Sequence, residues 1–173
     1  MNETLRTDYK HSLELLIDID QQVIKDFRAG KIVASELVRL NNINTETVKY
    51  IISQIGFPTI VSTSKKAYEA AVLVVLHSED IQLLTQSIKD LQNLDPTSID
   101  RRDIAYMIDK SKIIQNLPQM YGTQYKIGKD NTITYIDIEK PDELEKRRAE
   151  LGMESFDDYR KKVELSIVDL HET

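Results

Sequence analysis

Seven consecutive apolar residues, from Ala70 to Leu76, restrict the fold of this chain more than any other stretch. The run lies in a segment that begins at Ser64 and ends near His77, and as a helix it would be apolar on every side. A helix without a polar face must be covered all round by other parts of the chain. We therefore expect this helix at the centre of a helical fold.

Helical periodicity continues over most of the remaining sequence. Apolar residues at three- and four-residue steps predict a long amphipathic helix over 5–29, and Gly30 stands where a helix commonly ends. Pro141 suits the first turn of a later helix, and Asn44 and Asp80 are expected to cap two others. The further predicted helices span 44–55, 80–94, 101–116, 141–152 and 155–170, and residues 35–41 could form a short helix before them.

One segment breaks the helical pattern. Strand-forming residues, among them Tyr125 and Tyr135, lie on either side of the turn-rich tetrapeptide 128–131, which predicts a β-hairpin at about 124–138. At 173 residues the chain also has the usual size of one domain. We therefore predict a mainly α (α+β) fold: one compact helical domain, residues 1–173, with six or seven helices and this single hairpin.

Charge and residue types exclude several function classes. A formal net charge of -6 and a pI near 5.1 lack the electrostatic footprint of a nucleic-acid-binding protein. The absence of cysteine rules out disulfides and cysteine-ligated zinc, and it fits a reducing compartment. No stretch approaches the roughly 18 apolar residues of a membrane span, and the start lacks a signal-peptide pattern. We expect a soluble, cytoplasmic protein without a membrane partner.

Motifs for metals and cofactors are also missing from the sequence. The three histidines, His11, His77 and His171, show no metal-ligand spacing. There is no P-loop, no G-x-G-x-x-G and no G-x-S-x-G, so the common phosphate cradles and the nucleophile elbow are absent. We expect neither a metal nor a cofactor.

The segment from Ala34 to Ile52 imitates a helix-turn-helix, with a short helix, a turn and a second helix that opens on polar residues. That second helix carries no arginine to read bases, and the acidic chain shows no basic stripe. Two consecutive packed helices explain the pattern equally well. DNA binding is therefore the weaker interpretation, and we do not expect a nucleic-acid partner.

His77 stands at the end of the most apolar helix and is followed by Glu79 and Asp80. An imidazole beside carboxylates in such a place suits general acid–base catalysis. The alternative is a histidine favoured by the helix macrodipole, followed by the acidic cap of the next helix. The residues alone favour this second interpretation.

The densest cluster of hydrogen-bonding groups spans residues 119–124, between a proline and the first predicted strand. Its amides, phenol and hydroxyl could orient a polar ligand, and Gly122 would allow another group to approach the backbone closely. The same groups could instead satisfy one another and tie the hairpin to the helices. A ligand-binding loop and a self-satisfied turn are both open at this point.

Arg147 and Arg148 are neighbours on a predicted helix, where adjacent side chains point about 100° apart. We therefore expect one of them to face inward. An inward guanidinium binds a carboxylate or a phosphate well. A salt bridge to Asp109 or Asp137 is the alternative.

Two motifs together resemble an uncharacterised bacterial family that is catalogued as a domain of unknown function. They are Tyr-Gly-Thr-Gln at 121–124 and Arg-Arg-Ala-Glu-Leu-Gly-Met at 147–153, with Tyr159 after them. The resemblance extends over about residues 13–159, and the other residues that carry it are Asp20, Gln21, Gly56, Phe57, Pro58, His77, Asp109, Lys110 and Gln119. The chain departs from the family's usual Trp, Gln, Asp and Arg at Phe57, Leu76, Glu79 and Lys110.

The resemblance implies no activity, but it implies that polar residues far apart in the sequence form one pocket. We expect this pocket between the central helices and the hairpin, with a small polar or anionic ligand and metal-independent hydrolase or transferase chemistry. His77 is the candidate general acid or base, and Asp109 or Asp20 is the candidate carboxylate that orients it. The candidate ligand-binding residues are Asp20, Gln21, Gln119, Tyr121, Gly122, Thr123, Gln124, Arg147 and Arg148.

The alternative is a regulatory or protein-interaction domain without catalysis. In that case closed hydrogen bonds would bury the polar residues, and an exposed apolar patch would meet a protein partner.

Overall fold

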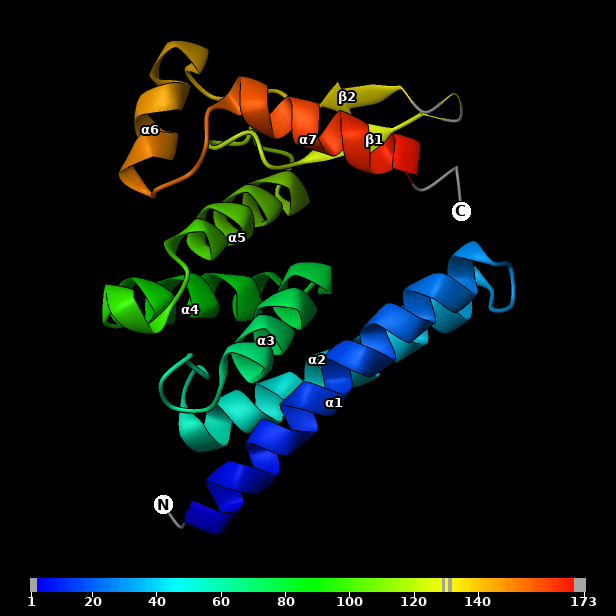
Figure 1. Ribbon diagram of the computed structural model, residues 1–173, viewed down its shortest axis with the longest axis vertical. Coiled ribbons are helices and arrows are strands. Elements are labelled where there is room, and N and C mark those ends of the chain that lie inside the picture. The colour runs from blue at the N-terminus through cyan, green and yellow to red at the C-terminus, as the bar shows by residue number, and fades with distance from the viewer. Residues whose placement is uncertain (1–2, 129, 131, 170–173) are drawn as a thin grey trace. The chain divides into compact units, whose positions relative to one another are not determined.

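The computed structural model describes residues 3–128, 130 and 132–169 (Figure 1). This part of the chain forms seven α-helices, two 3-10 helices and one two-stranded antiparallel hairpin, so the predicted mainly α fold is confirmed. The chain divides into two compact units, Met1–Asp100 and Arg101–Thr173, and the single domain over 1–173 stays a prediction. None of the described helices combines the length and the apolar composition needed to cross a membrane.

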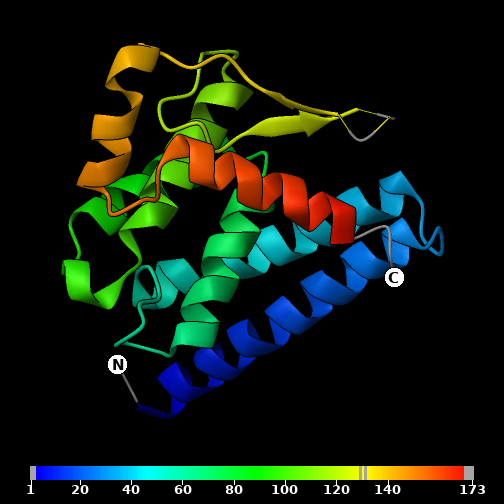
Figure 2. The same ribbon diagram turned by 45° about the horizontal axis from the view of Figure 1, so that its top comes forward.

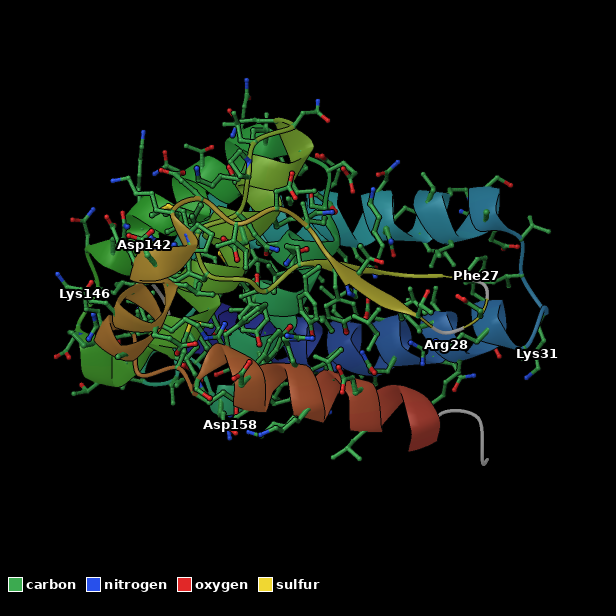
Figure 3. The ribbon with its side chains drawn as sticks, turned by 90° about the horizontal axis from the view of Figure 1, so that it is seen from above. Phe27, Arg28, Lys31, Asp142, Lys146 and Asp158 are labelled. Carbon is green, nitrogen blue, oxygen red and sulfur yellow. The ribbon has the colours of Figure 1, made fainter. Side chains whose placement is uncertain are left out.

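The N-terminal unit is built around the apolar run. Its elements are α1 (Glu3–Arg28), α2 (Ala34–Ile55), α3 (Lys65–His77), α4 (Ile81–Gln92) and the 3-10 helix η1 (Pro96–Ser98). Helices α1 and α2 lie side by side and antiparallel, and α3 packs on both (Figure 1 and Figure 2). Phe27, Arg28 and Lys31 mark the turn between α1 and α2 in Figure 3. Ala70 and Val75 of α3 are completely buried, so the predicted burial of this helix is confirmed within the N-terminal unit.

Helix α2 corrects the sequence-based prediction of two short helices over 35–41 and 44–55. It is one continuous helix, and Asn44 and Thr45, expected at a helix start, are buried in its middle. The Thr45 hydroxyl donates to the Asn41 carbonyl at 2.8 Å, so this polar group is satisfied within the helix. Packing has overridden the weak helix propensity of the Asn residues. The turn of the imitated helix-turn-helix is therefore absent from this segment.

Helix α4 begins at the predicted cap, Asp80. One carboxylate oxygen accepts the N–H groups of Gln82 and Leu83, both at 3.0 Å. The other oxygen accepts from Lys49 of α2 at 2.9 Å. The Leu83 N–H and Lys49 hold the pKa of the Asp80 carboxyl below its usual value of 3.8. A single carboxylate thus both caps α4 and pairs with α2.

We expect Asp80→Ala to lower the free energy of unfolding by about 1–2 kcal/mol at neutral pH, the usual effect of losing a helix cap. Because the pKa of Asp80 is lower in the folded chain than in the unfolded chain, its contribution is fully present above pH 3.8 and is lost as the pH falls through the folded value. Urea unfolding at neutral pH and in acid measures both effects. Asp80→Asn, which keeps a capping oxygen, should lose less stability. An Asp80→Ala effect that is equally large in acid would contradict this account.

The C-terminal unit combines the remaining helices with the hairpin. Its elements are α5 (Arg101–Ile114), β1 (Tyr125–Ile127), β2 (Ile133–Tyr135), the 3-10 helix η2 (Pro141–Glu143), α6 (Leu144–Glu150) and α7 (Phe156–Asp169). The strands pair with Tyr125 opposite Tyr135 and Ile127 opposite Ile133, and the predicted hairpin is confirmed. Residues 129 and 131 of the predicted turn, and 170 of the predicted last helix, lie outside the described residues.

Helix α7 runs alongside the hairpin, as both ribbon views show (Figure 1 and Figure 2). Tyr159 and Val163 of α7 form the centre of an apolar cluster. The partly buried residues packed against them are Tyr106, Tyr125, Ile133, Tyr135 and Phe156. Four of the eight tyrosines of the chain therefore gather in this one cluster.

Candidate functional site

A carboxylate and an imidazole meet in the N-terminal unit. Asp20 of α1 and His77 at the end of α3 are 57 residues apart in the sequence, and Oδ1 of Asp20 lies 3.1 Å from Nδ1 of His77. Asp20 is only 2% exposed, whereas the His77 side chain is 33% exposed. Gln21 donates its amide to the second oxygen of Asp20 at 3.3 Å. The structure thus brings together three of the residues that the sequence singled out.

Because Nδ1 of His77 faces Asp20, the contact determines which ring nitrogen carries the proton. A carboxylate next to Nδ1 favours the tautomer that carries its proton on Nδ1, so Nε2 is left as a proton acceptor. Among the described residues, Nε2 of His77 has no hydrogen-bond partner. The pair therefore presents one partly exposed basic nitrogen, held in place by a buried carboxylate.

Asp109 is the anchor of the Tyr-Gly-Thr-Gln loop in the C-terminal unit. The side chain is fully buried on α5. Its carboxylate accepts the backbone N–H groups of Met120, Tyr121 and Thr123 at 2.6, 3.0 and 2.9 Å, and the Thr123 hydroxyl at 2.9 Å. Both carboxylate oxygens are thereby engaged in holding the loop. The orienting role toward His77 that the sequence suggested for Asp109 stays a prediction.

Gln119 connects this loop to the hairpin. Its side-chain oxygen accepts the Gln124 N–H at 2.8 Å, and its amide donates to the carbonyls of Gln124 and Ile136 at 3.0 and 2.6 Å. Gln124 in turn donates its side-chain amide to the Thr123 hydroxyl at 3.2 Å. Most donors and acceptors of the cluster are therefore used within the protein, which is the arrangement of a self-satisfied turn.

Tyr121 is the exception in this loop. Its phenol has no hydrogen-bond partner among the described residues, and its side chain is half-buried. Burial, followed by the nearby Asp109 carboxylate, raises the pKa of the Tyr121 phenol above its usual value of 10.0. The group is therefore protonated at neutral pH and able to donate a hydrogen bond.

Gly122 allows a close approach, as expected, but the approaching group is an aromatic ring of the same unit. A Cβ atom on Gly122 would lie 2.6 Å from Cε2 of Phe156, and the residue has a φ of +71°. The left-handed backbone and the contact both require glycine. The sequence could indicate a special glycine here, but not its neighbour.

Arg148 is the inward-facing arginine that the sequence predicted, and Arg147 also reaches the 119–124 loop. Arg148 is 1% exposed and donates to the carbonyls of Glu154 and Tyr121 at 2.9 and 2.5 Å. The Arg147 side chain is 13% exposed and donates to the Met120 carbonyl at 2.9 Å.

The predicted salt bridges of these arginines to Asp109 or Asp137 are not formed within the described part of the chain. Arg147 has one carboxylate partner there, Glu143, at 3.6 Å, and its other contacts are carbonyl oxygens. The two side chains extend on different sides of the helix, and both are long enough to reach the loop. The two arginines therefore both bind the 119–124 loop, although they point in different directions from the helix.

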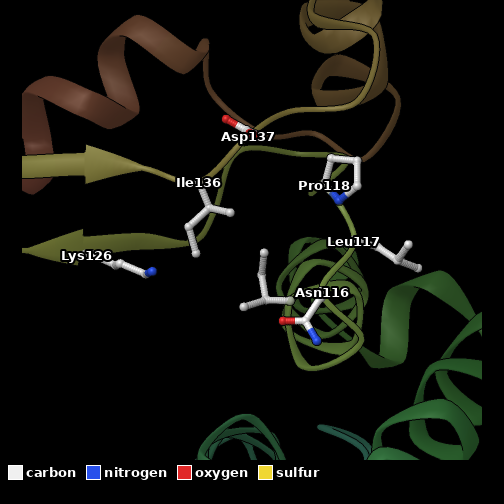
Figure 4. Close-up of a pocket in the computed structure, with 7 residues that line it drawn as sticks. Asn116, Leu117, Pro118, Lys126, Ile136 and Asp137 are labelled. Atoms are coloured by element: carbon white, nitrogen blue, oxygen red, sulfur yellow. The ribbon is translucent and has the colours of Figure 1, made fainter.

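A pocket of about 330 Å³ lies beside the loop in the same unit, between the end of α5 and the hairpin (Figure 4). Figure 4 shows Lys126 and Ile136 extending from the hairpin toward α5. The lining residues are Ile113, Asn116, Leu117, Pro118, Lys126, Ile136 and Asp137. None of them was a candidate from sequence, because they come from three segments that share no motif.

The candidate residues thus fall into two sets. Asp20, Gln21 and His77 meet in the N-terminal unit, whereas the Asp109-anchored loop and the two arginines belong to the C-terminal unit. The expectation that both sets line one pocket stays a prediction. Within the described residues, no three His, Cys, Asp or Glu side chains lie together in a way that could hold a metal ion.

Fold and site define a mainly helical protein with a carboxylate–histidine pair and a carboxylate-anchored loop. The sequence profile of a family of unknown function, DUF6624, matches residues 17–168, and the chain belongs to this family. The resemblance to a family of unknown function is thereby confirmed. No curated protein and no solved structure matches the chain.

Proposed function

We propose that this protein is a metal-independent hydrolase or group transferase that acts on a small polar or anionic ligand in the bacterial cytoplasm. The observation that carries the proposal is the Asp20–His77 pair, a buried carboxylate bound to a partly exposed imidazole at 3.1 Å. His77 is the general acid or base in this proposal, and Asp20 is its positioning residue.

The pair has the physical properties that such a role requires. When Nε2 takes a proton from a reacting hydroxyl or water, the adjacent Asp20 carboxylate stabilises the imidazolium that forms. Because Asp20 is itself held by Gln21, the imidazole needs little reorganisation during the reaction. A positioned general base of this kind contributes about 10²–10⁴-fold in rate.

Ligand binding by the motif residues of the C-terminal unit is a separate part of the proposal. Tyr121 supports it best, since its phenol is protonated and has no partner among the described residues. The side chains of Gln119 and Thr123 already form hydrogen bonds within the loop. Their role in this proposal is therefore to hold the loop backbone in position. Arg147 and Arg148 supply positive charge close to the same loop.

The test is a search for turnover in the full-length protein treated with a chelator. The substrate panel consists of p-nitrophenyl carboxylate esters, p-nitrophenyl phosphate esters and p-nitrophenyl glycosides. Thermal unfolding with nucleotides, sugar phosphates and carboxylates reports binding separately. We expect His77→Ala to lower the rate of the best substrate by at least about 10²-fold. His11→Ala, which removes an exposed histidine of α1, is the matched control and should leave the rate unchanged.

Asp20→Asn separates positioning from folding. It keeps the size of the side chain, but it removes the negative charge that stabilises the imidazolium, so the rate should fall while the pH profile changes. A rate that is equal in wild type and His77→Ala would contradict the proposal. So would a protein that neither binds nor converts any member of the panel.

The second candidate is a protein-interaction domain, and two observations favour it. The side chains of Asp109, Gln119 and Thr123 are occupied in closed hydrogen bonds. The N-terminal unit also exposes large apolar side chains, namely Leu15, Ile19, Val38, Ile43, Tyr50 and Val61. The absence of any ligand-dependent change in melting temperature, together with unchanged behaviour of His77→Ala, would favour this second function.

A further inference from the structure

Two buried polar atoms of the C-terminal unit lack a hydrogen-bond partner within the described part of the chain. They are Nη2 of Arg148 and the hydroxyl of Tyr135. Both residues border the same two rings: the Arg148 guanidinium lies 5.1 Å from the centre of Tyr159 and 5.7 Å from that of Phe156. The Tyr135 ring lies 6.4 and 5.1 Å from those centres. The two unpaired atoms therefore belong to one cluster.

Arg148 brings an uncompensated positive charge into this cluster. The residue is 1% exposed, and no described carboxylate lies within ion-pair distance of its guanidinium. Two carbonyl oxygens and the faces of Tyr159 and Phe156 compensate part of the charge. A buried cation with an N–H group left unpaired is costly, so its surroundings favour a negative group.

Tyr135 adds a second donor. Burial raises the pKa of the Tyr135 phenol above 10.0, and the nearby Arg160 and Arg148 only partly oppose this, so the hydroxyl keeps its proton at neutral pH. The residues Tyr135 and Phe156 are half-buried, which means that the cluster extends to the molecular surface. The cluster thus contains a neutral donor and a cationic donor that border the same two rings, with no acceptor for either atom among the described residues.

We propose that Nη2 of Arg148 and the hydroxyl of Tyr135 bind an oxygen atom of a small oxyanion, a carboxylate or a phosphate. Guanidinium and phenol groups both form charge-assisted hydrogen bonds to such an oxygen, and in the guanidinium bond the donor is charged as well. The sequence indicated Arg148 as a ligand contact but gave no reason to choose Tyr135. This site contains Arg148, a candidate ligand contact of the proposed function, and rests on that part of the proposal, but it needs only residues of the C-terminal unit and not the reaction at His77.

The experiment is thermal unfolding of the full-length protein in increasing sodium acetate or sodium phosphate, each compared with sodium chloride at equal ionic strength. We expect a saturable rise in melting temperature of at least about 2–4 °C with one of the two oxyanions. Acetate and phosphate are separate arms, so the effective one identifies the ligand class.

Tyr135→Phe is the decisive variant. It removes only the unpaired hydroxyl, so in chloride it should unfold at or above the wild-type temperature. In the effective oxyanion its apparent affinity should be at least about tenfold weaker, equivalent to losing one good hydrogen bond. Tyr125→Phe, which removes the hydroxyl of the cross-strand neighbour, is the matched control and should respond like wild type.

Two results would overturn the proposal. One is the absence of any rise beyond that in chloride with both oxyanions. The other is an equal rise in wild type and Tyr135→Phe, which would show that the anion binds elsewhere. Because the readout is stability and not turnover, neither result bears on the proposed role of His77.

Discussion

Replacing Asp109 by alanine is expected to lower the free energy of unfolding by about 3–5 kcal/mol, one of the largest effects of any single substitution in this chain. The carboxylate is completely buried and accepts the N–H groups of Met120, Tyr121 and Thr123. Without it these donors lose their acceptor, and each buried unpaired donor costs about 1–3 kcal/mol. Urea unfolding followed by circular dichroism measures the loss.

Two controls show whether this loss comes from the loop. Asp142→Ala removes an exposed carboxylate of η2, labelled in Figure 3, and should change stability by no more than about 0.5 kcal/mol. Hydrogen exchange of the 120–123 amides should accelerate in Asp109→Ala alone. Amide protection that is unchanged in Asp109→Ala would contradict the anchoring role of the carboxylate.

Replacing Gly122 by alanine is expected to cost about 2–5 kcal/mol, from two separate causes. An alanine in a left-handed conformation costs roughly 1–2 kcal/mol. The added Cβ would also lie 2.6 and 2.9 Å from two atoms of the Phe156 ring. That ring is packed against Tyr135 and Arg148, so it has little room to move, and overpacking of this kind costs about 1–3 kcal/mol.

Gly152 separates the two causes. Its φ of +70° is nearly the same as that of Gly122, but a Cβ there would meet nothing within 4 Å. Gly152→Ala should therefore show only the backbone cost of about 1–2 kcal/mol. In a double-mutant cycle, Phe156→Ala should recover part of the loss caused by Gly122→Ala. Equal losses for the two glycine variants in urea unfolding would exclude the contact with Phe156 as a cause.

Some of the fold could be predicted because it depends on short-range physics. The apolar run from Ala70 to Val75 can only be satisfied by burial on every side, and it forms the central helix. Asp80 caps a helix through N–H groups two and three residues away. The hairpin requires only two strand-forming segments close to a turn-rich tetrapeptide.

Where tertiary packing opposes local preference, the prediction was wrong. Asn44 is a good helix cap in isolation, yet the burial of its neighbours makes α2 continuous through it. A salt bridge of Arg147 or Arg148 to Asp109 or Asp137 was also expected, yet both side chains donate to backbone carbonyls of the 119–124 loop. Neither outcome can be predicted from the positions of Asn44, Arg147 and Arg148 in the sequence.

For the candidate site, the sequence by itself determined which chemical groups are present: one imidazole at the end of the apolar helix, the carboxylates of Asp20 and Asp109, and a loop rich in amides. Only the tertiary structure decided their partners. Asp20 meets His77 across 57 residues, and Asp109 meets the loop through backbone N–H groups. The reason is physical: hydrogen bonds between distant residues depend on how the helices pack, and backbone donors leave no signature in the sequence.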